Sequence, residues 1–366
     1  MKCSFNEKLY PLLAGALLAA PLSAAAADGN VTVYGKARTS VNFTDTDAAG
    51  SSNITSVSSN NSRLGFKGTE DLGNGMKAFF QFETLVNLDD GSGGSGGVTN
   101  TGTLLGSFRN SYVGLATGLG SFLLGATDNP YKLATGKLDI YADTLADFNA
   151  IIGNVSGAGT PFDEREPNSF NYWSPKFNGF QVQAGYRVDE TSGVNRDRYS
   201  VNANYESGPL FGSIAYEQHD NDNVAGAGGN DSDGLKFGVG YAFNEEKTKV
   251  NLVYEKLNED NIASVLDRDA WYLALAHKMG NNTFKAAFAN ADDNDVADNT
   301  GAKWFVLGLD HALSKRTAVY ALYTKTDNDS GARYGLGTGG SSGAVVPTAT
   351  TGLDPSSFSI GINHDF

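Results

Sequence analysis

The sequence predicts an all-β fold, a sixteen-stranded antiparallel transmembrane β-barrel with short turns at one rim and long loops at the other. Apolar and polar residues alternate along most of the chain, which is the period-two pattern of β-strands. Sixteen segments carry this pattern, and most are about nine to twelve residues long, the length of tilted strands that cross a membrane. Short turns alternate with long polar loops, as in an up-and-down barrel.

Residues 1–27 have the features of an export signal. Lys2 and Lys8 precede an apolar run over residues 9–22, and residues 24–27 are alanines. This pattern predicts a secretory signal peptide that is cleaved before Asp28, with an uncleaved membrane anchor as the alternative. We expect the remainder, residues 28–366, to form one barrel domain.

Composition excludes several kinds of site. The single cysteine, Cys3, lies in the predicted signal, so the mature chain is expected to hold neither a disulfide nor a thiolate metal site. Removing Lys2, Lys8 and Glu7 leaves a net charge of 25 − 40 = −15, which argues against nucleic acid as a partner. With 21 Phe, 16 Tyr and 45 Gly but no apolar run of about 20 residues after the signal, the chain is either a secreted β-protein or a membrane barrel.

The alternating segments follow one another in a regular order. Residues 45–60, rich in Ser and Asn, are predicted as a loop. Lys36 and Arg38 share one strand face, and Arg63 and Lys67 share another, so both pairs are expected to face a lumen. The predicted strands are residues 31–43, 62–72, 76–85, 107–117, 121–126, 168–174, 180–188, 198–206, 210–218, 234–243, 248–257, 268–278, 283–291, 302–313, 317–326 and 356–366.

One long segment, about residues 129–166, interrupts the series of strands and ends before Pro167. A structureless loop of this length is uncommon in a compact domain, so we interpret it as functional. A sheet in lipid must close on itself, and sixteen strands leave a water-filled lumen. We expect the segment to fold into this lumen and narrow it. Its acidic residues are Asp139, Asp143, Asp147, Asp163, Glu164 and Glu166.

The run SRLGFKGTEDLGNGMKAFFQFE (residues 62–83) resembles the trimeric general porins of Gram-negative outer membranes. VTVYG, NSYVGL, NSFNYWSPKFNGF, LSKRTAVYALY and the terminal HDF extend the resemblance over nearly the whole mature chain. It implies a homotrimer in the outer membrane, in contact with lipid and lipopolysaccharide, with periplasmic turns and external loops. It also implies passive diffusion of small hydrophilic solutes and ions, and a final strand with Phe366 that the barrel-insertion machinery reads.

The resemblance also implies which residues narrow the channel. Basic wall residues of the family correspond by motif to Arg63, Arg109 and Arg165, to which alternation adds Lys36, Arg38 and Lys67. The loop side would supply Asp139, Asp143, Asp147, Asp163 and Glu164, and the opposed charges would create a transverse field. Simple alternation aligns Arg109 with Val113 and Leu115, so we expect either a bulge nearby or that Arg109 does not line the channel. The run at residues 124–128 lacks an arginine that many relatives carry, which puts strong anion selectivity in doubt.

Other functions are weaker interpretations. Residues 228–234, 291–299 and 327–331 resemble calcium ligands in composition but lack the full spacing of a calcium loop. The four histidines are scattered, and no hydrolase motif is present. A secreted or surface adhesin or calcium-binding protein, and an outer-membrane hydrolase, are the alternatives. We expect a channel that is not an enzyme and needs no cofactor or metal.

Overall fold

The computed structural model describes most of the chain beyond the predicted signal peptide, residues 1–27, which lies outside the described residues. Nearly all described residues of regular structure lie in strands, and the few helical turns lie in one loop. None of these helices has the length and apolar character to cross a membrane. The described ranges are 31–49, 53–89, 104–156, 162–190, 196–222, 230–259, 267–337, 341–342 and 350–366.

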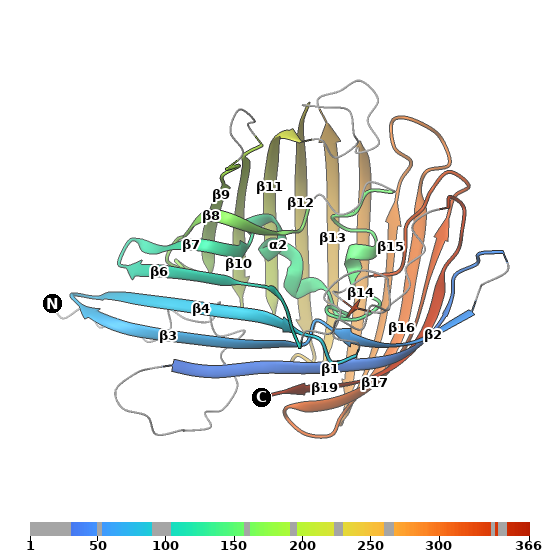
Figure 1. Cartoon of the computed structure of the whole chain (residues 1–366), viewed down its shortest axis with the longest axis horizontal. Helices are drawn as coiled ribbons and strands as arrows, with labels where there is room; N and C mark the ends of the chain where they lie inside the picture. Colours follow the sequence, from blue (N-terminus) through green and yellow to red (C-terminus); the bar gives the residue numbers. More distant parts are fainter. Residues whose placement is uncertain are drawn as a thin grey trace.

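The strands follow the chain in order (Figure 1). They are β1 (Val31–Asp45), β2 (Asn53–Asn60), β3 (Arg63–Gly73), β4 (Met76–Val86), β5 (Leu105–Phe108), β6 (Ser111–Thr117), β7 (Gly120–Asp128), β8 (Arg165–Trp173), β9 (Phe180–Arg187), β10 (Arg198–Ser207), β11 (Leu210–Asp222), β12 (Asn230–Phe243), β13 (Thr248–Glu259), β14 (Arg268–Met279), β15 (Asn282–Ala291), β16 (Ala302–Ala312), β17 (Thr317–Asn328), β18 (Ser341–Ser342) and β19 (Ser356–Asp365).

These strand segments form a closed sixteen-stranded antiparallel barrel, as predicted. Closure comes from the pairing of β1 with β19, which runs from Lys36 opposite Asp365 to Asp45 opposite Ser356. Two barrel strands are interrupted: β2 and β3 both pair with β1, and β5 and β6 both pair with β4. The two-residue β18 pairs with β2 outside this count.

The prediction of a loop over residues 45–60 was wrong, because Asn53–Asn60 form β2. Its backbone pairs with β1 from Asn53 opposite Asp45 to Ser59 opposite Thr39. Ser and Asn are usual in loops, but on this strand Ser58 and Asn60 point inward and are buried while Val57 is exposed on the outer face. A neighbouring strand that satisfies the backbone therefore outweighs the loop-like composition.

The barrel strands have an apolar outer face. In β14 the inward residues Tyr272 and Ala274 are buried, whereas the outward residues Trp271, Leu273 and Leu275 are exposed. Outward exposure of large apolar side chains is the pattern of strands that face lipid. The alternation read from the sequence is thus an alternation between lipid and the barrel interior.

The long loop between β7 and β8 lies inside the barrel (Figure 1). It contains α2 (Pro130–Thr135), η1 (Gly136–Leu138) and η2 (Phe148–Ala150). Asn129 begins α2 by accepting the Lys132 N–H, with Pro130 in the first turn. The expectation that this segment folds into the lumen is confirmed.

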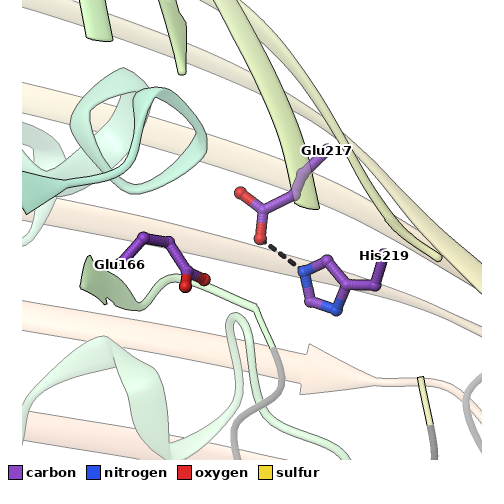
Figure 2. A group of neighbouring side chains, drawn as sticks. All are labelled: Glu166, Glu217 and His219. Carbon is purple, nitrogen blue, oxygen red and sulfur yellow. Dashed lines mark hydrogen bonds and ion pairs between the residues drawn. The ribbon is translucent and has the colours of Figure 1, made fainter. Parts of the chain in front are cut away.

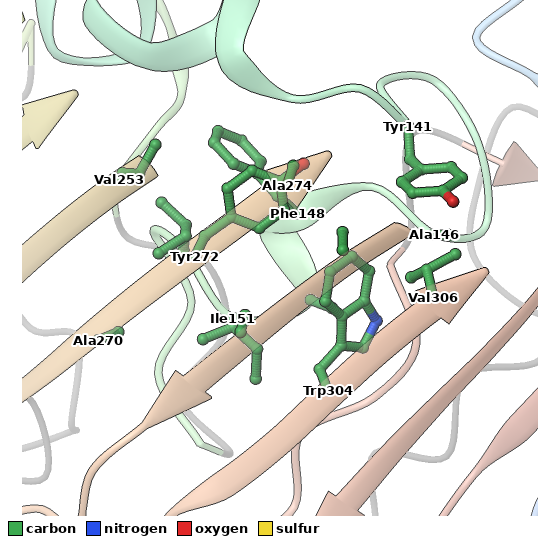
Figure 3. Close-up of a cluster of buried hydrophobic side chains, with 14 of the residues drawn as sticks. Tyr141, Ala146, Phe148, Ile151, Val253, Ala270, Tyr272, Ala274, Trp304 and Val306 are labelled. Carbon is green, nitrogen blue, oxygen red and sulfur yellow. The ribbon is translucent and has the colours of Figure 1, made fainter. Parts of the chain in front are cut away.

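Apolar side chains attach the loop to one arc of the wall (Figure 3). Tyr141, Phe148 and Ile151 of the loop pack on the inner faces of β13–β17, where they meet Tyr272 and Trp304 among small residues. The small wall residues leave room for the loop, because an alanine side chain occupies little of the volume inside the barrel. They are Ala270, Ala274, Ala287, Ala289, Ala291 and Ala302.

Candidate functional site

Asp143 joins the loop to the opposite arc of the wall. Its carboxylate lies 2.7 Å from Arg38 Nη1 and 3.1 Å from Arg63 Nη1, and it accepts a 2.9 Å hydrogen bond from Asn61 Nδ2. Asp143 has a positive φ of 60°, which aspartate tolerates better than most residues. Although burial acts to raise it, Arg63 and Arg38 hold the pKa of Asp143 below its usual value. The loop therefore carries a charged carboxylate to the arginines.

Two further arginines continue this row. Arg109 Nε lies 2.7 Å from Glu83, and Arg109 Nη1 donates to Asn61 at 3.1 Å. Arg165 Nη2 lies 2.8 Å from Asp128 Oδ1. The row of Arg38, Arg63, Arg109 and Arg165 is called the arginine ladder below.

The strand interruptions place parts of the ladder. The barrel strand made of β5 and β6 breaks at Arg109 and Asn110, with a register shift in its pairing to β4. Without a break, Arg109 would share the outward face of Val113 and Leu115, which are exposed. The expected irregularity near Arg109 is confirmed, and it turns the guanidinium toward Glu83 of the inner face.

The two predicted wall lysines lie beside the ladder. Lys36 stands directly opposite Arg63 in the pairing of β1 with β3. Lys67 Nζ lies 4.7 Å from the centre of the Tyr34 ring, and the Tyr34 hydroxyl donates to Glu83 at 2.9 Å. Both lysines therefore belong to the same arc as the four arginines.

Asp139 and Asp147 lie inside the loop itself. Asp139 accepts the N–H groups of Tyr141 at 2.8 Å and Phe148 at 3.1 Å, and Asp147 caps η2 by accepting the Asn149 N–H at 3.0 Å. Burial, together with the nearby Asp147, raises the pKa of Asp139 well above its ordinary value. Burial raises the pKa of Asp147 to about 6. These contacts hold the loop conformation and direct neither carboxylate at the ladder.

Asp163 and Glu164 attach the end of the loop to β12 and β10. Asp163 forms a buried ion pair with Lys236, and it accepts from Asn149 Nδ2 at 3.0 Å. Glu164 lies 2.9 Å from Arg198. Among the contacts described, their side chains therefore reach Lys236 and Arg198 at the base of the loop.

A second anchor joins the base of the loop to β11 (Figure 2). His219 Nε2 lies 2.7 Å from Glu217, and the His219 ring stacks on Phe162 of the loop with centroids 4.4 Å apart. Glu166 lies 2.8 Å from Arg198 and 3.5 Å from Arg187. Ligand atoms of Glu166, Glu217 and His219 lie within 4.8 Å of one another, but Glu166 is already neutralised by the two guanidinium groups. The cluster is an ion-pair anchor of the loop.

Sequence reasoning missed the carboxylates and amides that orient the ladder. Glu83 receives Arg109 and Tyr34, Asp128 receives Arg165, and Asn61 contacts both Arg109 and Asp143. In MKAFFQFETL (residues 76–85), Glu83 alternates in phase with Lys77 and Gln81, so the sequence holds a signal for its inward direction. The positions of Asn61 and Asp128 depend on strand breaks and strand ends, which alternation does not locate.

Comparison with known proteins places the chain in a family. The model of the family described as "Gram-negative porin" matches residues 13–331. The chain belongs to the Gram-negative porin family. This porin is 29% identical to outer membrane porin protein 32 of Delftia acidovorans, over 97% of this chain and 99% of that protein. It is 25% identical to the major outer membrane protein P.IB of Neisseria lactamica, over 97% and 99% of the two chains.

A solved structure agrees with this assignment. The anion-selective porin from Comamonas acidovorans superposes on this porin with a TM-score of 0.78 and 27% identity, over 93% of this chain and all of that one. The protein is thus an outer-membrane porin, a water-filled channel for passive diffusion of small hydrophilic solutes and ions. These findings support the channel and not the alternatives of an adhesin or a hydrolase.

Proposed function

We propose that the arginine ladder is the constriction wall of this porin and that it favours anions. The single observation that carries the proposal is the excess of positive charge on one arc. The four arginines face three carboxylates among the contacts described, those of Asp143, Glu83 and Asp128. One formal positive charge remains in excess, and Lys36 and Lys67 lie on the same arc.

The loop carboxylates support the same sign of selectivity. Asp143 is the loop carboxylate that contacts the ladder, whereas Asp139 and Asp147 are turned into the loop with raised pKa values. The sequence predicted a transverse field between wall cations and a row of loop carboxylates. In our proposal the ladder arc instead carries a net positive charge, and Asp143 is the loop carboxylate that faces it. In a narrow, partly desolvated opening such an excess attracts anions more strongly than it would in bulk water. The Comamonas acidovorans structure, which is of an anion-selective porin, is consistent with this.

Assembly is the second part of the proposal. We infer a homotrimer in contact with outer-membrane lipid and lipopolysaccharide, on the basis of the family and the apolar outer face. The insertion machinery would read the last strand with Phe366. Backbone hydrogen bonds of 3.0 Å in both directions join Phe366 to Gly35, so this residue takes part in barrel closure. The proposal is of a channel without catalytic activity.

The test is the reversal potential of purified protein in a planar bilayer under a salt gradient. Arg63→Ala removes one ladder charge, so the reversal potential should move toward that of a cation-selective pore, with wild-type openings in steps of three. Arg316→Ala is the matched control, since Arg316 is exposed in the turn between β16 and β17. An unchanged reversal potential in Arg63→Ala would reject the ladder as the selective element.

A further inference from the structure

Three lysines surround Ala276 on the inner face of the barrel, at the periplasmic end of β13–β15. Lys249 stands directly opposite Ala276 on one side, and Lys285 stands opposite it on the other. Lys278 follows two residues after Ala276, so it shares the same face and is the diagonal neighbour of Lys249, about 7–8 Å away along the sheet. Ala276 is inward and buried, in the same alternation as Tyr272.

The lysines of this region differ in their partners. Lys285 Nζ lies 2.9 Å from Asp310 and donates to the carbonyl oxygen of Ile140 at 3.0 Å. Lys247, in the adjacent turn, lies 3.2 Å from Glu245. Within the described part of the chain, Lys249 and Lys278 form no ion pair. Two adjacent ammonium groups therefore lack a direct ion-pair partner.

A cavity of about 610 Å³ opens in front of these two lysines. Its lining includes Ala276, Gly280 and Thr283, whose small side chains leave space between the ammonium groups. Lys247 and the exposed Glu245 and Glu246 of the adjacent turn complete the lining, so three lysines face two glutamates there. The cavity lies immediately on the periplasmic side of the loop, because Asn251, the next inward residue of β13 after Lys249, donates to the Leu138 carbonyl of the loop at 2.7 Å. The arginine ladder lies on the other arc, on β1 to β8.

We propose that Lys249 and Lys278 form a second anion site, on the periplasmic side of the constriction, for small solutes that carry two negative charges. Phosphate monoesters and dicarboxylates share this chemistry. The inference rests on the proposed anion preference of the ladder, because solutes that enter from outside the cell pass the ladder before they reach this site. Two adjacent ammonium groups bind a dianion better than a monoanion such as chloride, so the site retains dianions on the periplasmic side.

The experiment measures block of the chloride current through single trimers by glycerol 3-phosphate or succinate, added to one side and then to the other. It is made at about pH 8, where a phosphate monoester carries two charges, and at about 0.1 M salt, where the Debye length is ~10 Å. We expect block at lower concentration from the periplasmic side. Lys249→Gln with Lys278→Gln should raise that half-blocking concentration by about threefold to tenfold.

Lys315→Gln is the matched control, because it removes one exposed lysine from a periplasmic turn at another part of the rim. Heat-modifiable migration and stepwise openings show that each variant folds. An unchanged half-blocking concentration in the double variant, with wild-type anion preference intact, would reject this site alone. A wild-type reversal potential of a cation-selective pore would reject the proposed function instead. A response to one probe only would restrict the site to phosphate monoesters or to dicarboxylates.

Discussion

Two arcs of one barrel wall have opposite inner faces. The covered arc, the inner face of β13–β17, carries alanines with Tyr272 and Trp304, all buried under the loop. The ladder arc, the inner face of β1 to β8, carries arginines whose side chains keep 13–20% of their surface exposed. The strands of both arcs alternate in the same way and face lipid on the outside.

The difference shows that the polarity of an inward residue in this barrel follows what lies in front of it, either the loop or water. Where the loop covers the wall, small apolar residues are stable because no water reaches them. Where water fills the lumen, charged residues are stable because they stay hydrated and paired. Four substitutions, ordered from the largest expected effect to the smallest, test whether the covered arc and the ladder arc differ in this way.

The largest effect is expected from Ala289→Glu, which places a carboxylate between the covered arc and the loop. Ala289 is fully buried, and an unpaired buried charge costs on the order of 3–5 kcal/mol. The loop should leave the wall, so single-channel conductance should rise and ion preference should fall. Thr69→Glu puts the same group on the inner face of β3 and should leave the loop in place. Unchanged conductance in Ala289→Glu would show that the loop does not depend on this contact.

The next effect concerns pH and Asp147. Its pKa is raised to about 6 in the folded loop, so the folded state binds a proton more tightly than the unfolded state does. The docked loop should be most stable below about pH 4 and lose on the order of 3 kcal/mol as the pH rises through about 6. Hydrogen exchange of loop amides, corrected for its intrinsic pH dependence, measures this. Asp147→Asn should remove the part of the slope near pH 6, while Asp139, whose pKa is also raised by burial, keeps its own contribution. A profile unchanged near pH 6 would contradict the assignment.

A smaller effect is expected from Asp143→Asn, which weakens the contact between the loop tip and the ladder. A hydrogen bond to a charged group contributes about 1.5–3 kcal/mol. Arg38 and Arg63 should then be available to solutes, so the reversal potential should indicate stronger anion preference, with more current noise from the loop tip. Asp295→Asn, in the exposed loop between β15 and β16, is the control. A shift toward cations would mean that Asp143 is not the neutralising partner of the two arginines.

Tyr272→Phe should have the smallest effect. It removes the hydroxyl that accepts the Ile140 N–H at 3.3 Å and leaves the ring packed against Phe148. Loop stability should fall by about 1 kcal/mol, which hydrogen exchange of Ile140 would detect. Tyr254→Phe removes a hydroxyl from the outer face of the same arc and should leave the loop unaffected. Equal losses in the two variants would mean that the hydroxyl acts on the barrel and not on the loop.

The strands were predictable because successive residues of a barrel strand face lipid and the barrel interior in turn, which gives the sequence its period-two pattern. That pattern failed at β2, where Ser58 and Asn60 face the interior and a loop-like composition concealed a strand. Within the loop, acidity alone did not separate Asp143 from Asp139 and Asp147. Their different directions depend on the backbone conformation of the loop, including the positive φ of Asp143, and this conformation follows from packing against β13–β17. Glu83 differs from these three aspartates. Alternation in the sequence indicates its inward direction, but not its contacts with Arg109 and Tyr34.

The loop inside the barrel is not part of the surface that meets the membrane. It contacts the covered arc through apolar side chains and reaches the ladder through Asp143. Substitutions between Asn129 and Glu164 can therefore alter the size and charge limits for solutes while every lipid-facing residue stays the same. Selection for solute uptake can therefore change the loop, while selection for membrane insertion acts on the lipid-facing strands. Solute selectivity and membrane insertion can change independently.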